Sequence, residues 1–446
     1  MRPSGSFKVI LMRGDMNNPA SIYHLSDLSN HLRVVTVPMR DRESAAVALW
    51  VRVGGRYEPK KLSGVSHFLE HMLFKGTKRR NSRQIKREVE GVGGVLNAFT
   101  GEEATCYFAK LLVGHYSRAV DVLSDMVREA TLLDKELERE RPVILEEIKM
   151  YRDQPAQHVH ELLSELMWPD HSLGRNLAGT AESVSAISRR AMMDYKQKYY
   201  QPKNVLLSVA GSVSHAEVLE LAQKSFPVRA DGAASRFAAV EMRQRKPRYQ
   251  FIEKDTEQTH LVLGFHGFSR RDKRRYALGT LNVLLGGNMS SRLFEEVREK
   301  RGLAYEIRSS VGHYQDTGSL TISAGTENKK AGLTIAVALE ELWKLIKKPV
   351  PEEELKRAKD YYVGQFLMGL EDTLDHLLWV GEKVLYHEAP PDRAEILRRI
   401  QSVTAREIQE VARDIFQTAK FNLALIGPLK EKEQAKIRRG VESHEF

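Results

Sequence analysis

The sequence predicts an α+β protein made of two similar domains. A chain of 446 residues is too long for one ordinary hydrophobic core. Segment 228–246, VRADGAASRFAAVEMRQRK, is rich in small and charged residues and has no sustained hydrophobic period, which is typical of a linker. The same order of predicted elements follows on each side of it, which indicates a duplicated domain. We therefore expect domains at 22–227 and 247–446, joined by the linker 228–246.

Strands and helices alternate in a matching order in the two halves. Runs with alternating apolar residues, or with a glycine turn before them, predict four strands in each half. These are 32–37, 45–53, 93–100 and 104–111 in the first half, and 249–253, 259–265, 302–309 and 319–324 in the second. Each set of strands is followed by a long amphipathic helix, at 116–129 and at 330–345.

The next predicted helices can be laid side by side. KELERERPVILEEI, 135–148, resembles EELKRAKDYYVGQF, 353–366, and this register places Glu140 opposite an alanine and Glu147 opposite a glutamine. The helix predicted at 276–285, YALGTLNVLL, also lacks the histidines that its counterpart in the first half carries. Residues that only stabilised the fold should be tolerated in both copies. The difference therefore favours a functional site in the first domain.

Composition excludes several classes of protein. Hydrophobic residues make up 42% and charged residues 29%, as in globular proteins, and no apolar run approaches the roughly 18 residues of a membrane span. The single cysteine, Cys106, excludes an internal disulfide and a cysteine-rich zinc site and favours a cytoplasmic location. The net charge of +10 is spread among acidic residues, without the aromatic and glycine pattern of an RNA-binding sheet. We expect no nucleic-acid and no membrane partner.

The segment HFLEHMLFKGT, 67–77, holds the strongest signal for chemistry. His67 and His71 are four residues apart, so they share a helical face, and Glu70 flanks that face. Their neighbours are strongly apolar, so the helix is predicted to be buried, where two imidazoles and a carboxylate need partners. A bound cation satisfies all three. A catalytic zinc needs three protein ligands and an open position for water, so one ligand is still to be found.

Three segments together resemble the insulinase and pitrilysin family, which includes the mitochondrial processing peptidases and single-chain bacterial relatives. They are SGVSHFLEHMLFKGT, with the inverted HxxEH motif, GGVLNAFTGEEATCYF and RPVILEEIKM. The similarity extends from about residue 22 to about residue 427. It implies two domains that each contain a mostly antiparallel sheet packed with helices and form a clamshell around a chamber. It also implies a zinc-dependent metalloendopeptidase that acts on short or unfolded peptides.

The resemblance implies the remaining metal-site residues. The third Zn²⁺ ligand is a glutamate 76 residues beyond His71, which is Glu147, and Glu140 supports the site from outside the ligand set. Glu146 is adjacent to Glu147, and its side chain would project about 100° away on a helix. Pro142 lies between Glu140 and Glu147, so either a helix begins there or the helix is kinked.

The resemblance also implies how substrate binds. The strand in GGVLNAFT is an edge strand to which a peptide adds by main-chain hydrogen bonds, with Asn97, Phe99 and Thr100 as substrate contacts. Arg298 and Tyr305, in the second half, bind the substrate carbonyl, where a zinc hydrolase benefits from donors.

We expect Glu70 to activate the water. We also expect a homodimer, because this one chain carries both the zinc-binding residues and the Arg298 and Tyr305 pair. One alternative is a presequence-processing peptidase subunit that works with a partner. Another is a non-catalytic core-type assembly subunit, against which the intact HxxEH argues.

Overall fold

A computed structural model describes residues 11–12, 23–227, 236–386 and 392–443, and the chain divides into two compact units. Both units are α+β, as the sequence predicts. Unit 1 comprises Met1–Ile148, Asn176–Ala238 and Leu367–Pro391, and unit 2 comprises Lys149–Arg175, Ala239–Phe366 and Asp392–Phe446. Each unit thus contains one segment from the opposite half of the sequence. Residues 228–235 of the predicted linker lie outside the described residues.

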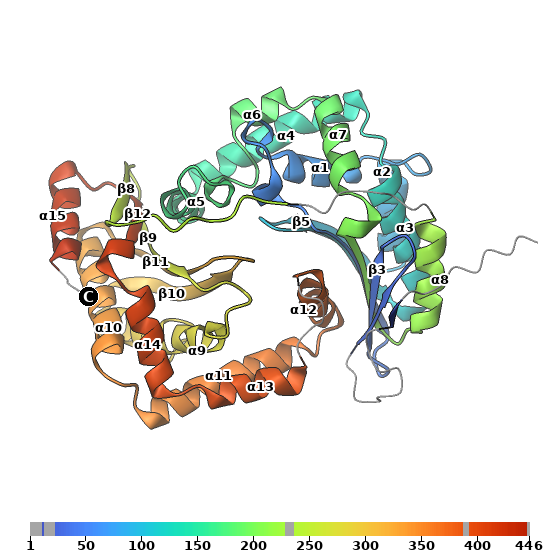
Figure 1. Ribbon diagram of the computed structural model, residues 1–446. Coiled ribbons are helices and arrows are strands. Elements are labelled where there is room, and N and C mark those ends of the chain that lie inside the picture. Colours follow the sequence, from blue (N-terminus) through green and yellow to red (C-terminus); the bar gives the residue numbers. More distant parts are fainter. Residues whose placement is uncertain (1–10, 13–22, 228–235, 387–391, 444–446) are drawn as a thin grey trace, which may run out of the picture. The chain divides into compact units, whose positions relative to one another are not determined.

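The sheet of unit 1 is mostly antiparallel and has the strand order β1-β2-β3-β7-β4-β6-β5 (Figure 1). Among the described strands of this sheet, β3 and β7 form the one parallel pair. Strand β5 stands at one edge of this sheet. The strands are β1 Leu11–Met12, β2 His24–Asp27, β3 Arg33–Pro38, β4 Ser44–Val51, β5 Val95–Thr100, β6 Thr105–Leu112 and β7 Val205–Gly211.

The sheet of unit 2 has the order β10-β11-β9-β12-β8, and within the part of the chain that the structure describes its one parallel pair is β12 and β8. Read from the other edge, β8-β12-β9-β11-β10 repeats the order β3-β7-β4-β6-β5, including the position of the parallel pair. This match confirms the predicted duplication. The strands are β8 Arg248–Glu253, β9 Gln258–Gly267, β10 Ala304–His313, β11 Gly318–Glu327 and β12 Asn422–Gly427.

Helices cover both faces of the first sheet, as the alternation along β4 requires. Val47 and Leu49 belong to the core that holds α1 and α3, whereas Ala48 and Trp50 belong to the core that holds α12. Helices α3 and α12 accordingly lie on opposite sides of the sheet (Figure 1). The helices wholly or mainly in unit 1 are α1 Val65–Leu73, α2 Ser82–Glu90, α3 Tyr116–Glu129, α4 Asp134–Asp153, α6 Ala181–Ala186, α7 Arg189–Tyr199, α8 His215–Ser225 and α12 Thr373–Tyr386.

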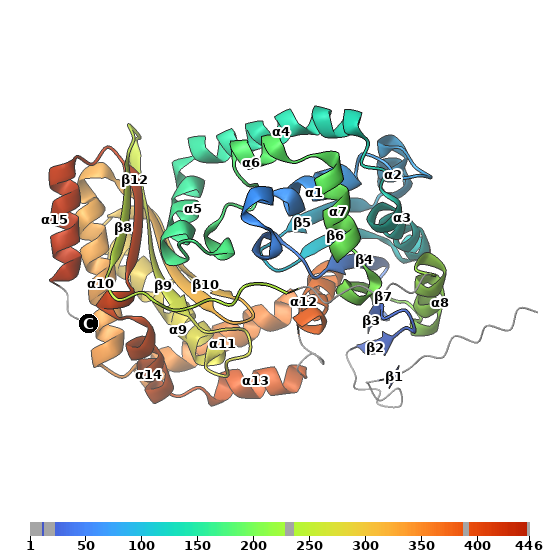
Figure 2. The same cartoon turned by 45° about the horizontal axis from the view of Figure 1, so that its top comes forward.

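Unit 2 is layered in the same way. Leu261 and Leu263 of β9 face the core formed with α9, α10 and α14, and Val262 faces the core formed with α5. Figure 2 shows α10 and α5 on opposite sides of the second sheet. The helices wholly or mainly in unit 2 are α5 Pro155–Met167, α9 Arg275–Leu285, α10 Ala331–Lys347, α11 Glu352–Gly369, α13 Arg393–Ser402, α14 Ala405–Ile415 and α15 Glu431–Glu442.

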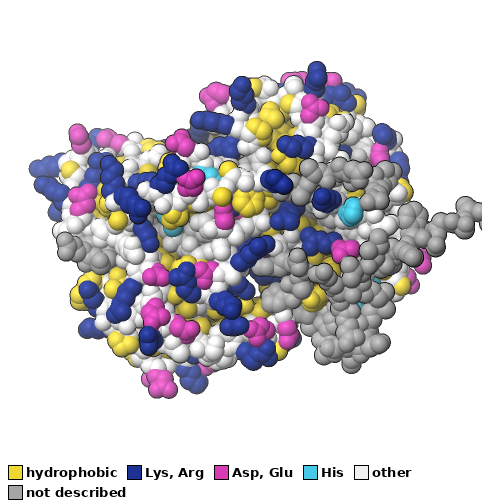
Figure 3. Space-filling model, in the orientation of Figure 1, with side chains coloured by type: hydrophobic (Ala, Val, Ile, Leu, Met, Phe, Trp, Pro, Cys, Tyr) yellow, Lys and Arg dark blue, Asp and Glu magenta, His cyan; other side chains and the backbone are white. Residues whose placement is uncertain are grey.

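The surface shows basic and acidic side chains interspersed over the face drawn in Figure 3. This distribution agrees with the scatter of charge along the sequence. Among the described residues, the helices are all too short or too polar to cross a membrane.

Candidate metal centre

Helix α1 begins at a position that only glycine fills without strain. Gly64, which precedes Val65, has a φ of +90°, and a Cβ there would lie 2.5 Å from the carbonyl oxygen of Ala178. The buried carboxylate of Glu58 accepts from the backbone N–H of Gly64 at 2.8 Å and of Ser66 at 2.7 Å. A carboxylate at this end satisfies free N–H groups and complements the helix dipole. The start of α1 is therefore fixed.

The two faces of α1 have different roles. Four side chains on one face are fully buried in the core of unit 1: Phe68, Leu69, Met72 and Leu73. His67, Glu70 and His71 lie on the other side and are only partly buried. Burial of the apolar face therefore directs the HxxEH side chains toward α4.

Helix α4 supplies the carboxylates. It runs from Asp134 to Asp153 with Pro142 inside it, so the helix does not begin at the proline. Proline interrupts one backbone hydrogen bond, but the buried positions Leu137, Glu140, Ile144 and Ile148 keep one face of the helix in register on both sides of it. The predicted helix therefore carries both glutamates toward α1.

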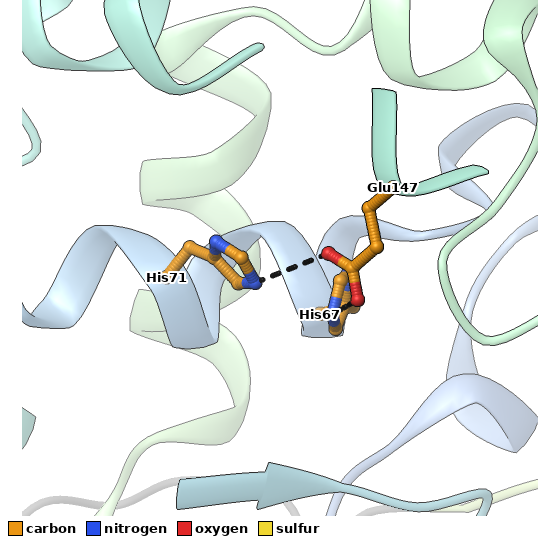
Figure 4. A group of neighbouring side chains, drawn as sticks. All are labelled: His67, His71 and Glu147. Atoms are coloured by element: carbon orange, nitrogen blue, oxygen red, sulfur yellow. Dashed lines mark ion pairs between the residues drawn. The ribbon is translucent and has the colours of Figure 1, made fainter. Parts of the chain in front are cut away.

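His67, His71 and Glu147 converge between α1 and α4 (Figure 4). Nε2 of His67 lies 3.7 Å from Oε1 of Glu147, and Nε2 of His71 lies 3.7 Å from Oε2. One ligand atom from each of the three residues lies within 4.8 Å of the others. The neighbouring Glu146 is exposed and is not part of this group.

The donor set suits zinc. Two imidazole nitrogens and one carboxylate form a common three-ligand set for catalytic zinc, which leaves a position for water or substrate. The three side chains are 15%, 23% and 23% exposed for His67, His71 and Glu147, so the group is sheltered but reachable. Burial, followed by the nearby His71, lowers the pKa of His67 to about 4. His67 is therefore neutral near pH 7, which is the form that binds metals.

Glu140 holds the second imidazole. Nδ1 of His71 donates to Oε1 of Glu140 at 2.9 Å, so Nε2 is left to face Glu147. Burial alone would lower the pKa of His71, but the hydrogen bond that its Nδ1 donates to Glu140, together with the adjacent carboxylates, raises it. Burial alone would raise the pKa of Glu140, but hydrogen bonds from His71 and Lys75 lower it. The pair is thus a charge-assisted hydrogen bond.

Glu70 lies beside this group and is tied to the sheet. Oγ1 of Thr100, at the end of β5, donates to Oε2 of Glu70 at 2.5 Å. Burial raises the pKa of Glu70, and the Thr100 hydrogen bond opposes that rise. A carboxylate with a raised pKa next to a metal site is suited to take up a proton near neutral pH.

The three predicted substrate contacts on β5 do not share a face. Strand alternation places Thr100 toward Glu70 and places Asn97 and Phe99 on the opposite face. Asn97 is exposed, and its side-chain oxygen accepts from the backbone N–H of Ala98 at 2.8 Å. Phe99 is 40% exposed and packs edge-on against Trp50. The structure brings only Thr100 of these three to the HxxEH helix.

Arg298 and Tyr305 meet within unit 2. Arg298 belongs to a π-helix, Phe294–Glu299, and its guanidinium carbon lies 4.9 Å from the centre of the Tyr305 ring and 4.6 Å from that of Phe294. Tyr305, on β10, is 78% exposed although it is a large aromatic residue. The structure therefore places these two side chains together on the surface of unit 2.

Sequence reasoning missed two residues of the site, Lys75 and Glu58. Nζ of Lys75 lies 2.5 Å from Oε2 of Glu140. Lys75 is four residues after His71, and that spacing could have suggested that the two share a partner. Glu58 caps α1 from outside the motif, and no spacing in the sequence marks it.

Comparison with known proteins places this geometry in context. Residues 33–181 match the family described as Insulinase (Peptidase family M16), and residues 186–362 match Peptidase M16 inactive domain. An uncharacterized zinc protease of Streptomyces coelicolor is 36% identical over 93% of this chain and 91% of its own length. One of Bacillus subtilis is 37% identical over 90% and 97%. The crystal structure of a protease from Helicobacter pylori matches with a TM-score of 0.87 and 25% identity, and the match covers 91% of this chain and 99% of that one.

Proposed function

The chain belongs to the insulinase family, peptidase family M16, and is a zinc metalloprotease, and we propose that it cleaves short or unfolded peptides internally. The observation that carries this proposal is the convergence of His67, His71 and Glu147, with Glu70 beside them. The homologous second unit builds the same strand order without such a group at the matching helix, α9. The metal site is therefore assigned to unit 1.

His67, His71 and Glu147 would hold the zinc ion. When bound, zinc lowers the pKa of a water molecule and polarises a carbonyl group. Glu70 takes the proton of the attacking water at Oε1, because Oε2 already accepts from Thr100. It then returns that proton to the nitrogen of the departing amine, so that the carboxylate is regenerated. Glu140 keeps the proton of His71 on Nδ1 throughout.

The substrate is proposed to add to the free edge of β5 as an extended strand. Strand β5 pairs only with β6 among the described strands, so its other edge can pair with a peptide main chain. Such pairing requires an extended peptide, which favours unfolded over folded substrates. We assign Asn97, Phe99 and Thr100 to this edge, with Thr100 acting through Glu70.

Arg298 and Tyr305 are proposed to bind the carbonyl oxygen of the scissile bond. Their contact with each other and the exposure of Tyr305 support a role outside the core of unit 2. A guanidinium and a phenol both donate hydrogen bonds, as an oxyanion requires. Because one chain carries these residues and the metal-binding residues, a different subunit is not needed for chemistry. We propose that the protein is cytoplasmic and forms a homodimer. Light scattering of the purified protein tests the oligomeric state.

The deciding experiment compares the wild type with Glu70→Gln. We expect about one zinc per chain in both proteins, because Glu70 is not a ligand, and hydrolysis of an unstructured peptide only by the wild type. Full activity in the variant would overturn the role of Glu70. Wild-type protein that holds zinc yet needs an added subunit for activity would favour the presequence-processing alternative, and protein without zinc would favour the assembly subunit.

A further inference from the structure

Lys75 belongs to a chain of contacts that ends at the metal centre. Nζ of Lys75 lies 2.5 Å from Oε2 of Glu140, and the other oxygen of that carboxylate, Oε1, lies 2.9 Å from Nδ1 of His71. Lys75 follows the end of α1 by two residues, and its backbone N–H is anchored on the carbonyl oxygen of Met72 at 3.1 Å. The two oxygens of Glu140 are therefore each held by a different residue of the same segment.

The buried carboxylate of Glu140 needs a positively charged partner, and Lys75 provides it. The side chain of Glu140 is only 9% exposed, and a carboxylate so poorly hydrated must have its charge and its lone pairs satisfied by protein groups. The carboxylates of Glu70 and Glu147 add negative charge nearby. Within the described part of the chain, Lys75 is the one lysine or arginine that forms an ion pair with any of these three glutamates. Before a metal binds, it is the fixed positive charge of the site.

The contact with Lys75 also fixes the orientation of the Glu140 carboxylate. A carboxylate held at one oxygen can rotate about its last bond and present either oxygen to the imidazole. With Oε2 fixed by Lys75, Oε1 remains in the plane that accepts the proton of His71 Nδ1, and Nε2 keeps its lone pair directed toward Glu147. The tautomer of a ligating histidine is set by the hydrogen bond of its other nitrogen.

We propose that Lys75 is a positioning residue for zinc binding: through Glu140 it fixes the ring orientation and tautomer of His71. This inference rests on the proposed function, since it concerns the same metal centre. His67 has no such support, because its Nδ1 is buried without a hydrogen-bond partner among the described residues. The orientation of the ligand set is thus maintained mainly from the His71 side.

A purely structural role makes a different prediction. An ion pair between the end of α1 and α4 could stabilise the fold without influence on the metal, and its loss would then lower only the thermal stability. A purely electrostatic role would have the opposite sign, because a nearby positive charge repels a cation, and its removal would tighten zinc binding. A measurement of zinc affinity therefore distinguishes the positioning role of Lys75 from a purely structural role and from a purely electrostatic role.

The test is a double-mutant cycle on the dissociation constant of zinc. The affinity of full-length wild type, Lys75→Met, Glu140→Gln and the double variant is measured by competition with a chelator at fixed pH. We expect Lys75→Met to weaken binding by about 10-fold to 100-fold, the range for loss of a residue that supports a ligand. The double variant should bind no more weakly than Glu140→Gln alone. Lys75→Arg should recover part of the loss, because it restores a cationic donor.

Lys78→Met is the matched control. Lys78 lies three residues further on and pairs with Glu129, away from the metal centre, and its side chain is 75% exposed. We expect its zinc affinity to equal that of the wild type. Unchanged or tighter zinc binding in Lys75→Met would overturn the inference, even if the melting temperature of that variant were lowered. Additive effects of the two substitutions on zinc affinity would also overturn it. Wild-type protein that fails to bind zinc at all would instead overturn the proposed function, and the inference with it.

Discussion

Thr100 and Glu70 are joined by a 2.5 Å hydrogen bond that connects the end of strand β5 to helix α1. The strand proposed to bind the peptide and the carboxylate proposed to move the proton are thereby fixed to each other. In the proposed complex, the distance between the peptide on β5 and Glu70 is therefore set by a strand and a helix and not by a loop. Thr100, which the resemblance implies as a substrate contact, donates its hydroxyl proton to the proposed base.

Replacement of Thr100 by valine should shift the pH dependence of hydrolysis. Burial raises the pKa of Glu70, and the Thr100 hydroxyl opposes that rise because it donates to the ionised carboxylate. Without the donor the pKa of Glu70 rises further. A base works only when deprotonated, so the acid limb of kcat/KM should move to higher pH. An acid limb at the wild-type position would contradict the assignment of Glu70 as the base.

Removal of a metal ligand should abolish both zinc binding and activity. His67→Ala, His71→Ala and Glu147→Gln each leave two of the three ligands, and we expect zinc to be lost on dialysis. Glu146→Gln is the matched control, because that exposed residue is adjacent to Glu147 but lies outside the group. It should retain about one zinc per chain. Loss of zinc from Glu146→Gln with retention in Glu147→Gln would reverse the assignment.

Gly64→Ala should destabilise unit 1 more than Gly93→Ala. Both glycines have positive φ, +90° and +78°, which costs alanine about 1–2 kcal/mol. At Gly64 the new Cβ would also lie 2.5 Å from the carbonyl oxygen of Ala178, whereas at Gly93 nothing lies within 4 Å. We expect urea unfolding of Gly64→Ala to show a loss of at least about 3 kcal/mol, because a clash adds to the strain. Equal losses of unfolding free energy in the two variants would show that the backbone at Ala178 moves to accommodate the new Cβ.

Stability should fall as the pH drops from about 6.5 toward 4, in part because of His215. Its ring lies between the hydroxyl groups of Ser26 and Thr36, each at 2.9 Å, and burial, followed by the nearby His24, lowers its pKa to about 4. Below the pKa of a histidine in the unfolded chain, the unfolded state binds a proton that the folded state refuses. The loss amounts to about 3 kcal/mol at most for one residue. Urea unfolding at several pH values should show that the free energy of unfolding of His215→Gln falls less steeply with decreasing pH than that of the wild type.

The sequence predicted the strands and the group His67, Glu70 and His71 because each depends on local spacing. Glu147 and Glu140 lie on another helix and were implied only by the resemblance to the insulinase and pitrilysin family. The HxxEH spacing places His67 and His71 on one helical face wherever that helix lies, and alternation along β4 requires two covered faces. The sequence does not indicate which helix covers the second face of this sheet. Helix α12 comes from the second half of the sequence yet packs on the first sheet, where a Cβ on Gly381 would lie 2.4 Å from Nε1 of Trp50. An amphipathic pattern shows that a face is buried, but not against which sheet.

Lys75 illustrates the same limit within the site. Its partner is 65 positions away on another helix, so its role depends on how α1 and α4 pack. Pro142 left two alternatives, a helix that begins at the proline or a kinked helix. The structure contradicts the first, because α4 continues through Pro142 with buried residues on both sides of it.

The repeated strand order has a consequence for the metal-free protein. The second sheet reaches the same topology without an HxxEH helix, so this architecture does not depend on an ion for its assembly. We therefore expect the apoprotein to keep its fold when zinc is removed, unlike a zinc finger, which unfolds without its metal. Peptide hydrolysis should then be lost when a chelator removes zinc and return when zinc is added back.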